Sequence, residues 1–260
     1  MSRNFELLEQ AGRTLNIEPA PKLKPAPAVV KRNENGHRSE NGHRKNTGLN
    51  INRIVDEESL KLVQRLFLMQ MGTSPRSVVF AGIDHGNGCS RMCAMAAQTL
   101  AENVSGSVCV VDANLRAPSL AQFFGVTPHR GLTDFVVGEN PIQNFTQRVQ
   151  PNNLWLLACG TQAYDSVNLL KADRLKTWLP LLRDAFDYVL IDAPPLNQYA
   201  EAVGLGQLAD GLVLVLEANT TRRESALRVT EMLRVAQVQV LGAVLNKRTF
   251  PIPQSLYHRL

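Results

Sequence analysis

Short apolar runs recur along the chain from residue 77 onward, and each is apolar at nearly every position instead of alternating with polar residues. Strands covered by helices on both faces have this pattern, because neither face meets water. The segments between the runs carry apolar residues at helical spacing. The pattern therefore predicts an α/β fold, a doubly wound and mostly parallel sheet with helices on both faces. The predicted strands are 77–82, 107–113, 154–160, 188–195, 211–218 and 239–247.

A helix is predicted ahead of the first strand, where residues 51–70 present a broad apolar face. We interpret this helix as the start of one folded domain over residues 51–250, followed by a tail at 251–260. A chain of 260 residues can bury one substantial core of this kind. The apolar members of the helix are Ile54, Leu60, Leu62, Val63, Leu66, Phe67 and Met69.

The first fifty residues differ from the rest in composition. Phe5, Leu8 and Leu15 stand at helical spacing, which predicts a short amphipathic helix within residues 1–17. Residues 18–50 are rich in proline and polar residues and offer too little apolar surface to offset the entropy of ordering. We therefore predict a disordered basic linker there.

The net charge of +5 is concentrated in this N-terminal arm. Residues 1–50 hold nine lysines and arginines against five acidic residues, whereas the remainder holds 19 against 18. A nearly neutral domain argues against a dedicated nucleic-acid surface, so no nucleic-acid partner is expected. The composition of the arm is typical of a solvated linker. Its basic charge would also allow it to contact anionic lipid or an acidic partner.

A cytoplasmic location is expected, since the sequence shows no membrane span and no signal peptide. No apolar run approaches the roughly 18 residues that cross a bilayer, and the N-terminal residues lack the apolar stretch of a signal peptide. The four cysteines, at positions 89, 93, 109 and 159, form no CxxC pair. In a reducing compartment they are expected to be small buried side chains, not disulfides or metal ligands.

A glycine-bearing loop, DHGNGCS at 84–90, follows the first predicted strand and opens a predicted helix. Gly86 and Gly88 allow backbone N–H groups to approach phosphate oxygens, and the helix dipole adds favourable partial charge. Ser90 stands where the hydroxyl of a phosphate loop would bind Mg²⁺, whereas the position that is lysine in that motif is Cys89. Two glycines alone are equally compatible with a tight turn that binds nothing.

Two aspartates narrow the choice between these interpretations. Asp112 and Asp192 each follow a predicted strand, in the segments VVDANLR and LIDAPP. The carboxyl ends of parallel strands border the crevice in which such sheets bind ligands. We therefore expect both side chains to point into that crevice and to have access to a metal-bound nucleotide.

The order of these motifs resembles the bacterial tyrosine kinases of capsule and exopolysaccharide synthesis, which are P-loop NTPases related to septum-site and partition ATPases. The family pattern PGEGKS is matched by residues 84–90 with the lysine lost, and DxDxR is matched by residues 112–116 with Asn114 in place of the second aspartate. The pattern DxxP is intact at 192–195. The similarity extends over roughly residues 54–247.

The resemblance implies binding of ATP or ADP with Mg²⁺, and tyrosine phosphorylation in the parent family. It further implies ring-like association of copies, a membrane partner that controls polysaccharide chain length, and a peripheral location at the inner face of the cell membrane. Asp112 and Asp192 would be the catalytic residues, and Ser90, Asp112 and Asp192 the metal ligands. The implied nucleotide contacts are Gly86, Asn87, Gly88, Cys89, Ser90 and Arg91 on the phosphates and Asn246 near the adenine.

The departures from the family pattern predict a degenerate kinase, or pseudokinase, that acts as a regulatory or scaffolding protein. Loss of the lysine removes a charged hydrogen bond worth roughly 1.5 to 3 kcal/mol, or about ten- to a hundredfold in binding. Phosphoryl transfer should suffer more, because it depends on neutralising charge in the transition state. The oligomerisation pattern ExxRxxR is weakened to Glu58, Lys61 and Gln64, and Tyr257 alone represents the tyrosine-rich tail.

Three alternatives stay open at this point. The chain is an active autokinase if Arg91 reaches back to replace the missing charge. It is a partition-type positioning ATPase in the second alternative, although it lacks that group's additional lysine at the start of the loop. In the third, Cys89 is a redox or nucleophilic thiolate, since a helix N-terminus favours the charged form of a thiol.

Overall fold

The computed structural model describes residues 51–69, 74–127, 130–137, 140–160 and 172–248. The predicted N-terminal helix at 1–17, the linker at 18–50 and the tail at 251–260 lie outside the described residues. Among the residues described, no helix is both long and apolar enough to cross a membrane.

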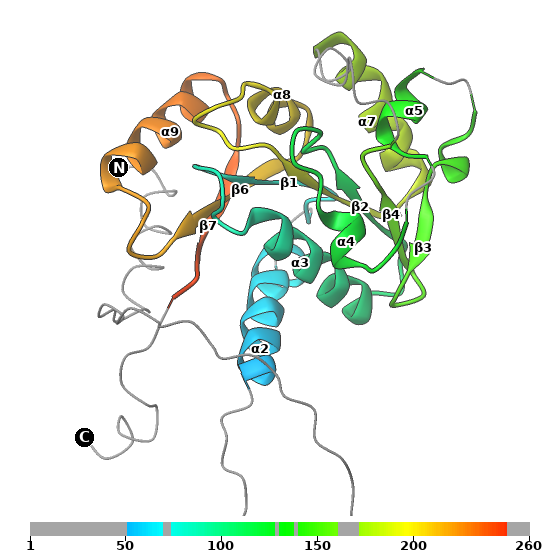
Figure 1. Cartoon of the computed structure of the whole chain (residues 1–260), viewed down its shortest axis with the longest axis horizontal. Helices are drawn as coiled ribbons and strands as arrows, with labels where there is room; N and C mark the ends of the chain where they lie inside the picture. The colour runs from blue at the N-terminus through cyan, green and yellow to red at the C-terminus, as the bar shows by residue number, and fades with distance from the viewer. Residues whose placement is uncertain (1–50, 70–73, 128–129, 138–139, 161–171, 249–260) are drawn as a thin grey trace, which may run out of the picture.

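A seven-stranded sheet forms the centre of the domain, with strand order β3-β4-β2-β5-β1-β6-β7 (Figure 1). Every neighbouring pair is parallel except β3 and β4, which run antiparallel. The predicted doubly wound, mostly parallel fold is therefore confirmed, and all six predicted strands are present. The strands are β1 (Ser77–Gly82), β2 (Val108–Asp112), β3 (Gln147–Val149), β4 (Leu154–Leu157), β5 (Tyr188–Ala193), β6 (Gly211–Glu217) and β7 (Val240–Asn246).

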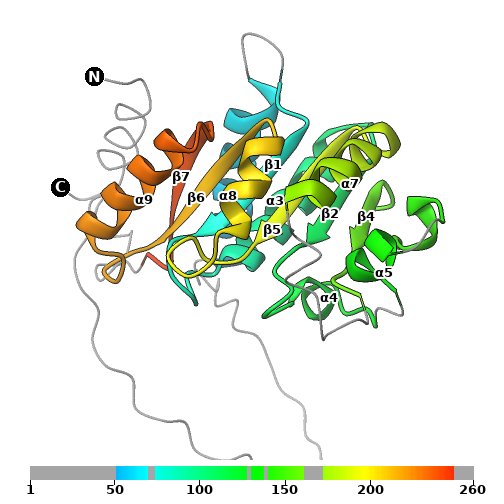
Figure 2. The same ribbon diagram turned by 90° about the horizontal axis from the view of Figure 1, so that it is seen from above.

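Helices cover the sheet on both faces, and each face has its own apolar core (Figure 2). Helices α2, α3 and α4 pack on one face, where the small side chains of α3 allow close approach to the strands. Helices α5, α7, α8 and α9 pack on the other face. The helices are α2 (Ile51–Val63), α3 (Cys89–Asn103), α4 (Leu120–Phe123), α5 (Leu132–Val137), α7 (Ala172–Ala185), α8 (Glu201–Leu208) and α9 (Arg223–Val235), with a π-helical turn η1 (Gln64–Leu68) and a 3₁₀ turn η2 (Ile142–Asn144).

The predicted helix at 51–70 is present as α2 and the π-helical turn η1 that continues it. Leu66 and Phe67 in this turn are buried, and the Phe67 ring meets the Tyr188 ring edge-on with centroids 6.0 Å apart. Met69, which was assigned to the apolar face of this helix, is instead 70% exposed.

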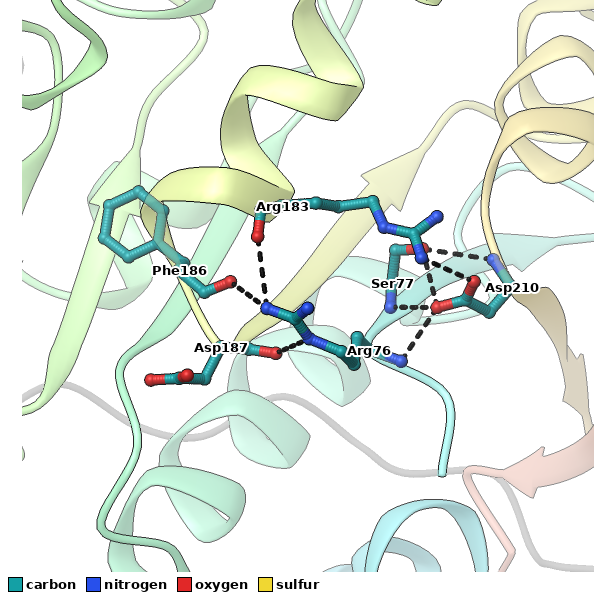
Figure 3. A network of polar contacts seen from close by, with 6 residues as sticks. All are labelled: Arg76, Ser77, Arg183, Phe186, Asp187 and Asp210. Atoms are coloured by element: carbon teal, nitrogen blue, oxygen red, sulfur yellow. Dashed lines mark hydrogen bonds and ion pairs between the residues drawn. The ribbon is translucent and has the colours of Figure 1, made fainter. Parts of the chain in front are cut away.

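A polar network fixes the amino end of β1, opposite the end that carries the glycine loop (Figure 3). The Arg76 guanidinium donates to the backbone carbonyls of Arg183, Phe186 and Asp187 at 2.9 to 3.1 Å. Asp210 accepts hydrogen bonds from the backbone N–H groups of Arg76 and Ser77, both at 2.8 Å. The network joins the end of α7 to the start of β1.

We expect Asp210→Ala to lower the free energy of unfolding by about 1 to 3 kcal/mol, because it leaves the two N–H groups at the start of β1 without their acceptor. Urea titration followed by circular dichroism measures the change. Asp184→Ala is the matched control, since Asp184 is an exposed aspartate on α7 close to the network. Equal stability of the two variants would show that the network does not support β1.

Candidate nucleotide-binding site

The loop between β1 and α3 has the backbone conformation that the two glycines permit. Gly86 and Gly88 have φ angles of 83° and 79°, in the left-handed region that side chains disfavour. Gly88 has a second constraint, because a Cβ atom there would overlap the side-chain nitrogen of Asn246. Both glycines are therefore required by the shape of the loop.

Hydrogen bonds hold this loop on both sides. The buried Asn87 side chain accepts from the backbone N–H of Asp84 at 2.7 Å. The segment after β5 crosses the loop, where Asn197 donates its side-chain amide to Asp84 at 2.8 Å and its backbone N–H to Ile83 at 3.0 Å. From the other side, Asn246 at the end of β7 donates to the Asn87 carbonyl at 2.8 Å. The loop is thus preorganised by the protein itself.

A cleft of about 470 Å³ opens beside the loop, at the carboxyl ends of the strands. It is bordered by the loop and the start of α3, by the segment after β2, and by the residues that follow β5. All six predicted phosphate contacts line it, whereas Asp112, Asp192 and Asn246 do not. The lining residues are Gly82, Asp84, His85, Gly86, Asn87, Gly88, Cys89, Ser90, Arg91, Asn114, Ala117, Pro118, Ser119, Ala193 and Pro195.

The two predicted aspartates lie side by side beneath the surface of the cleft. They are register partners in the parallel pairing of β2 and β5, and their exposed fractions are 1% for Asp112 and 0% for Asp192. The expectation that both point openly into the crevice is therefore corrected. Asp112 Oδ2 accepts the backbone N–H groups of Ser119 and Leu120, both at 3.0 Å, so half of this carboxylate is engaged at the start of α4.

Burial and mutual repulsion disfavour the charged form of this pair. Burial, and then the charge of Asp112, raise the pKa of Asp192 to about 8, although the nearby Ser90 hydroxyl and Cys89 thiol oppose the shift. Burial also raises the pKa of Asp112 to about 6, against the effect of the backbone N–H groups that it accepts.

The site fits a hard divalent cation. Asp112 Oδ1 and both carboxylate oxygens of Asp192 are buried without a hydrogen-bond partner among the described residues, although Ser90 and Cys89 lie near Asp192. No group of three His, Cys, Asp or Glu side chains able to hold a metal gathers in the part of the chain that the structure describes. Mg²⁺ prefers oxygen ligands and is usually bound by one or two carboxylates together with phosphates and waters. Ser90, Asp112 and Asp192 are therefore suitable ligands for it.

The structure does not favour a reactive Cys89 thiolate. Burial, and then the charge of Asp192, raise the pKa of the Cys89 thiol well above its usual value, which favours the protonated thiol. All four cysteines are free; Cys93 and Cys109 are buried, as predicted, and Cys89 and Cys159 are half-buried. The position that is lysine in a phosphate loop is therefore neutral in this protein.

Two cations lie near the site: Lys247, which the sequence analysis did not identify as a site residue, and Arg116, which it identified only as the arginine of the DxDxR pattern. The Lys247 ammonium donates to the Gly86 carbonyl at 2.6 Å and lies 3.2 Å from a carboxylate oxygen of Glu217. Arg116 forms an ion pair with Glu201 at 2.8 Å and stacks over the Tyr199 ring. Lys247 stands at the end of the last apolar run. The carboxyl ends of parallel strands border the ligand crevice, and this argument, which identified the aspartates, applies to Lys247 as well. The contact of Arg116 with Glu201 joins positions 85 residues apart and has no local signal.

No protein-family model matches the chain. Among curated proteins, tyrosine-protein kinase YwqD of Bacillus subtilis is 29% identical over 171 residues, which cover 66% of this chain and 72% of that protein. The putative tyrosine-protein kinase EpsB of Ralstonia solanacearum is 30% identical over 200 residues, 75% of this chain and 26% of EpsB. The succinoglycan biosynthesis transport protein ExoP of Rhizobium meliloti is 28% identical over 182 residues, 69% of this chain and 23% of ExoP. The chain thus spans about a quarter of the two longer relatives.

Solved structures agree on the fold. The kinase domain of the Escherichia coli tyrosine kinase ETK superposes with a TM-score of 0.67 at 21% identity, covering 76% of this chain and 79% of that domain. The cell division ATPase MinD of Pyrococcus furiosus gives a TM-score of 0.58 at 22% identity, covering 72% of this chain and 80% of MinD. The chain therefore shares its fold with a tyrosine-kinase domain and with a cell division ATPase.

Proposed function

We propose that this chain, which is related to the bacterial tyrosine kinases of capsule and exopolysaccharide synthesis, is a nucleotide-binding regulator of that synthesis with impaired phosphoryl transfer. One observation carries the proposal. A preorganised phosphate loop lies beside a pair of buried carboxylates, three of whose four oxygens have no hydrogen-bond partner among the described residues, while the loop's lysine position holds a neutral thiol.

Nucleotide phosphates are the ligands that this arrangement suits. The backbone N–H groups around Gly86 and Gly88 and the amino end of α3 favour phosphate oxygens. Ser90, Asp112 and Asp192 would hold Mg²⁺, which when bound neutralises phosphate charge and orients the phosphates. The cleft and the carboxylates thus support binding of MgATP or MgADP, with Asn246 proposed near the adenine through its place beside the loop.

Phosphoryl transfer is expected to be poor for two reasons that concern charge. The Cys89 thiol supplies no positive charge to the loop, and Asn114, which lines the cleft, supplies an amide where a second carboxylate would orient the metal and its waters. Binding tolerates such losses better than catalysis does, because phosphoryl transfer depends on stabilising charge that develops in the transition state.

The place of action that we propose is the inner face of the cell membrane, beside a membrane protein that controls polysaccharide chain length. Relatives named as kinases and one named for succinoglycan biosynthesis transport support this setting. Self-association is proposed through α2, where the family's oligomerisation pattern is reduced to Glu58, Lys61 and Gln64.

Calorimetric titration of the purified protein with MgADP and MgATP tests the proposal. We expect weak but measurable binding, and no tyrosine phosphorylation when the protein is incubated with MgATP and probed with an anti-phosphotyrosine antibody. Absence of affinity at millimolar nucleotide would contradict the nucleotide assignment. Strong autophosphorylation that is lost in Asp112→Ala would instead establish an active kinase.

A further inference from the structure

Lys247 has an unusual backbone conformation directly after β7. Its φ angle of 55° lies in the left-handed region, which side chains other than glycine seldom adopt. Such conformations are frequently found where a protein holds a functional side chain in place. The Lys247 side chain is directed to the phosphate loop, where its ammonium donates to the Gly86 carbonyl at 2.6 Å.

The Lys247 side chain follows the outer edge of the loop. A Cβ atom on Gly88 would lie 4.0 Å from Lys247 Cε, so the aliphatic stem passes Gly88 before the ammonium reaches Gly86. Glu217, at the end of the neighbouring strand β6, holds the ammonium from the other side at 3.2 Å. The Glu217 side chain is only 19% exposed, which fixes this anchor.

Lys247 and Arg91, which lines the cleft, are the two cations beside the loop that could replace the missing loop lysine. Arg116 is engaged by Glu201 and the Tyr199 ring. An ammonium group has three donors, and Lys247 uses two of them, on Gly86 and Glu217, among the residues that the structure describes. Lys247 stands outside the lining of the cleft, and its side chain is 49% exposed. Contact with a phosphate therefore requires rotation about the stem that moves the ammonium away from the Gly86 carbonyl.

We propose that Lys247 supplies, from the end of β7, the cation that binds the polyphosphate group of a nucleoside di- or triphosphate. This inference rests on the proposed function, because it concerns the same loop. It adds a site residue from the end of β7. It also accounts for the affinity that we propose for nucleotide phosphates, although position 89 holds a neutral thiol.

Calorimetry with MgADP and with inorganic pyrophosphate tests the role of Lys247, since pyrophosphate lacks the adenine. Lys247→Met is expected to weaken both ligands about tenfold, the lower end of the range for a charged hydrogen bond. Lys247→Arg should retain the affinity. Arg234→Met is the control, because Arg234 on α9 is also an exposed cation paired with a glutamate, Glu231, at 2.6 Å.

Two double variants separate a binding role from a structural one. Cys89→Lys combined with Lys247→Met moves the cation to the usual loop position. If both lysines serve the same phosphates, the double variant should bind as tightly as Cys89→Lys alone, whereas a merely structural loss would leave it about tenfold weaker than that single variant. Glu217→Gln combined with Lys247→Met removes the carboxylate left without its partner, and affinity should stay low. Recovery of wild-type affinity in this second variant would show repulsion by Glu217 and overturn the proposal.

The remaining outcomes are also decisive. The proposal is wrong if the wild-type protein binds nucleotide and Lys247→Met binds it equally well, or if Arg91→Met weakens binding while Lys247→Met does not. A wild-type protein that binds neither MgADP nor pyrophosphate would contradict the proposed function itself, a failure distinct from that of Lys247.

Discussion

Asp192→Asn is expected to stabilise the metal-free protein at pH 8.5 and, in the same molecule, to abolish the Mg²⁺ dependence of nucleotide binding. The amide has nearly the shape of the carboxylate but carries no charge to bury. It also removes the carboxylate that has both oxygens buried without a hydrogen-bond partner among the described residues. If Asp192 served only to stabilise the fold, its replacement would not give a protein that is more stable without metal and has lost the Mg²⁺ dependence of nucleotide binding.

The sign of the pH effect follows from the pKa of Asp192. Its pKa is raised from 3.8 to about 8, first by burial and then by the charge of Asp112, so the folded protein binds the proton more tightly than the unfolded chain does. The stabilising contribution of the protonated acid is complete below about pH 4 and is lost as the pH rises towards 8. Asp192→Asn should therefore raise stability less at pH 5 than at pH 8.5.

Thermal unfolding at the two pH values, with and without MgCl₂, measures this effect. We expect Tm to rise by on the order of 5 °C in the variant at pH 8.5 without metal, because a few kcal/mol corresponds to such a shift in a domain of this size. The exposed Asp184 provides the control, Asp184→Asn. A Tm gain of the same size at pH 5 would contradict the assignment of the effect to titration of Asp192.

The sheet and the loop were predictable because their causes are local. Parallel strands buried on both faces must be apolar throughout, and the left-handed turns at Gly86 and Gly88 require glycine. Strand β3 was missed because its three residues, Gln147–Val149, include two exposed side chains and pair antiparallel at the edge of the sheet. Such a strand leaves no apolar pattern in the sequence.

The parts of the site that the sequence did not predict depend on contacts between distant positions. Asp112 was placed correctly at the end of β2, but its engagement at the start of α4 depends on how the following turn folds back. The raised pKa of the Cys89 thiol at the start of α3 is caused by burial and by Asp192, which lies in β5. The contact of Lys247 with Gly86 joins residues 161 positions apart. Motif order can place these residues at one edge of the sheet, but it gives neither their burial nor their partners.

Cys89→Lys is expected to raise affinity for MgADP by about ten- to a hundredfold, the equivalent of one charged hydrogen bond to the phosphates. The rest of the loop is already shaped for phosphate: Gly86 and Gly88 adopt the required turns and Asn87 is fixed from both sides. Asp192 lies beside position 89, so a lysine there places a cation next to a carboxyl group whose charged form it favours. Calorimetric titration measures the gain, and Cys89→Met controls for side-chain size without charge.

We expect the Cys89→Lys substitution to restore kinase activity less fully than it restores nucleotide binding. Asn114 has an exposed fraction of only 8%. Its neutral amide would orient Mg²⁺ and its waters less strongly than a carboxylate. We therefore expect autophosphorylation to emerge only in the double variant with Asn114→Asp, as detected with an anti-phosphotyrosine antibody. Unchanged MgADP affinity in Cys89→Lys, with the fold intact by circular dichroism, would show that charge at position 89 is not what limits this site.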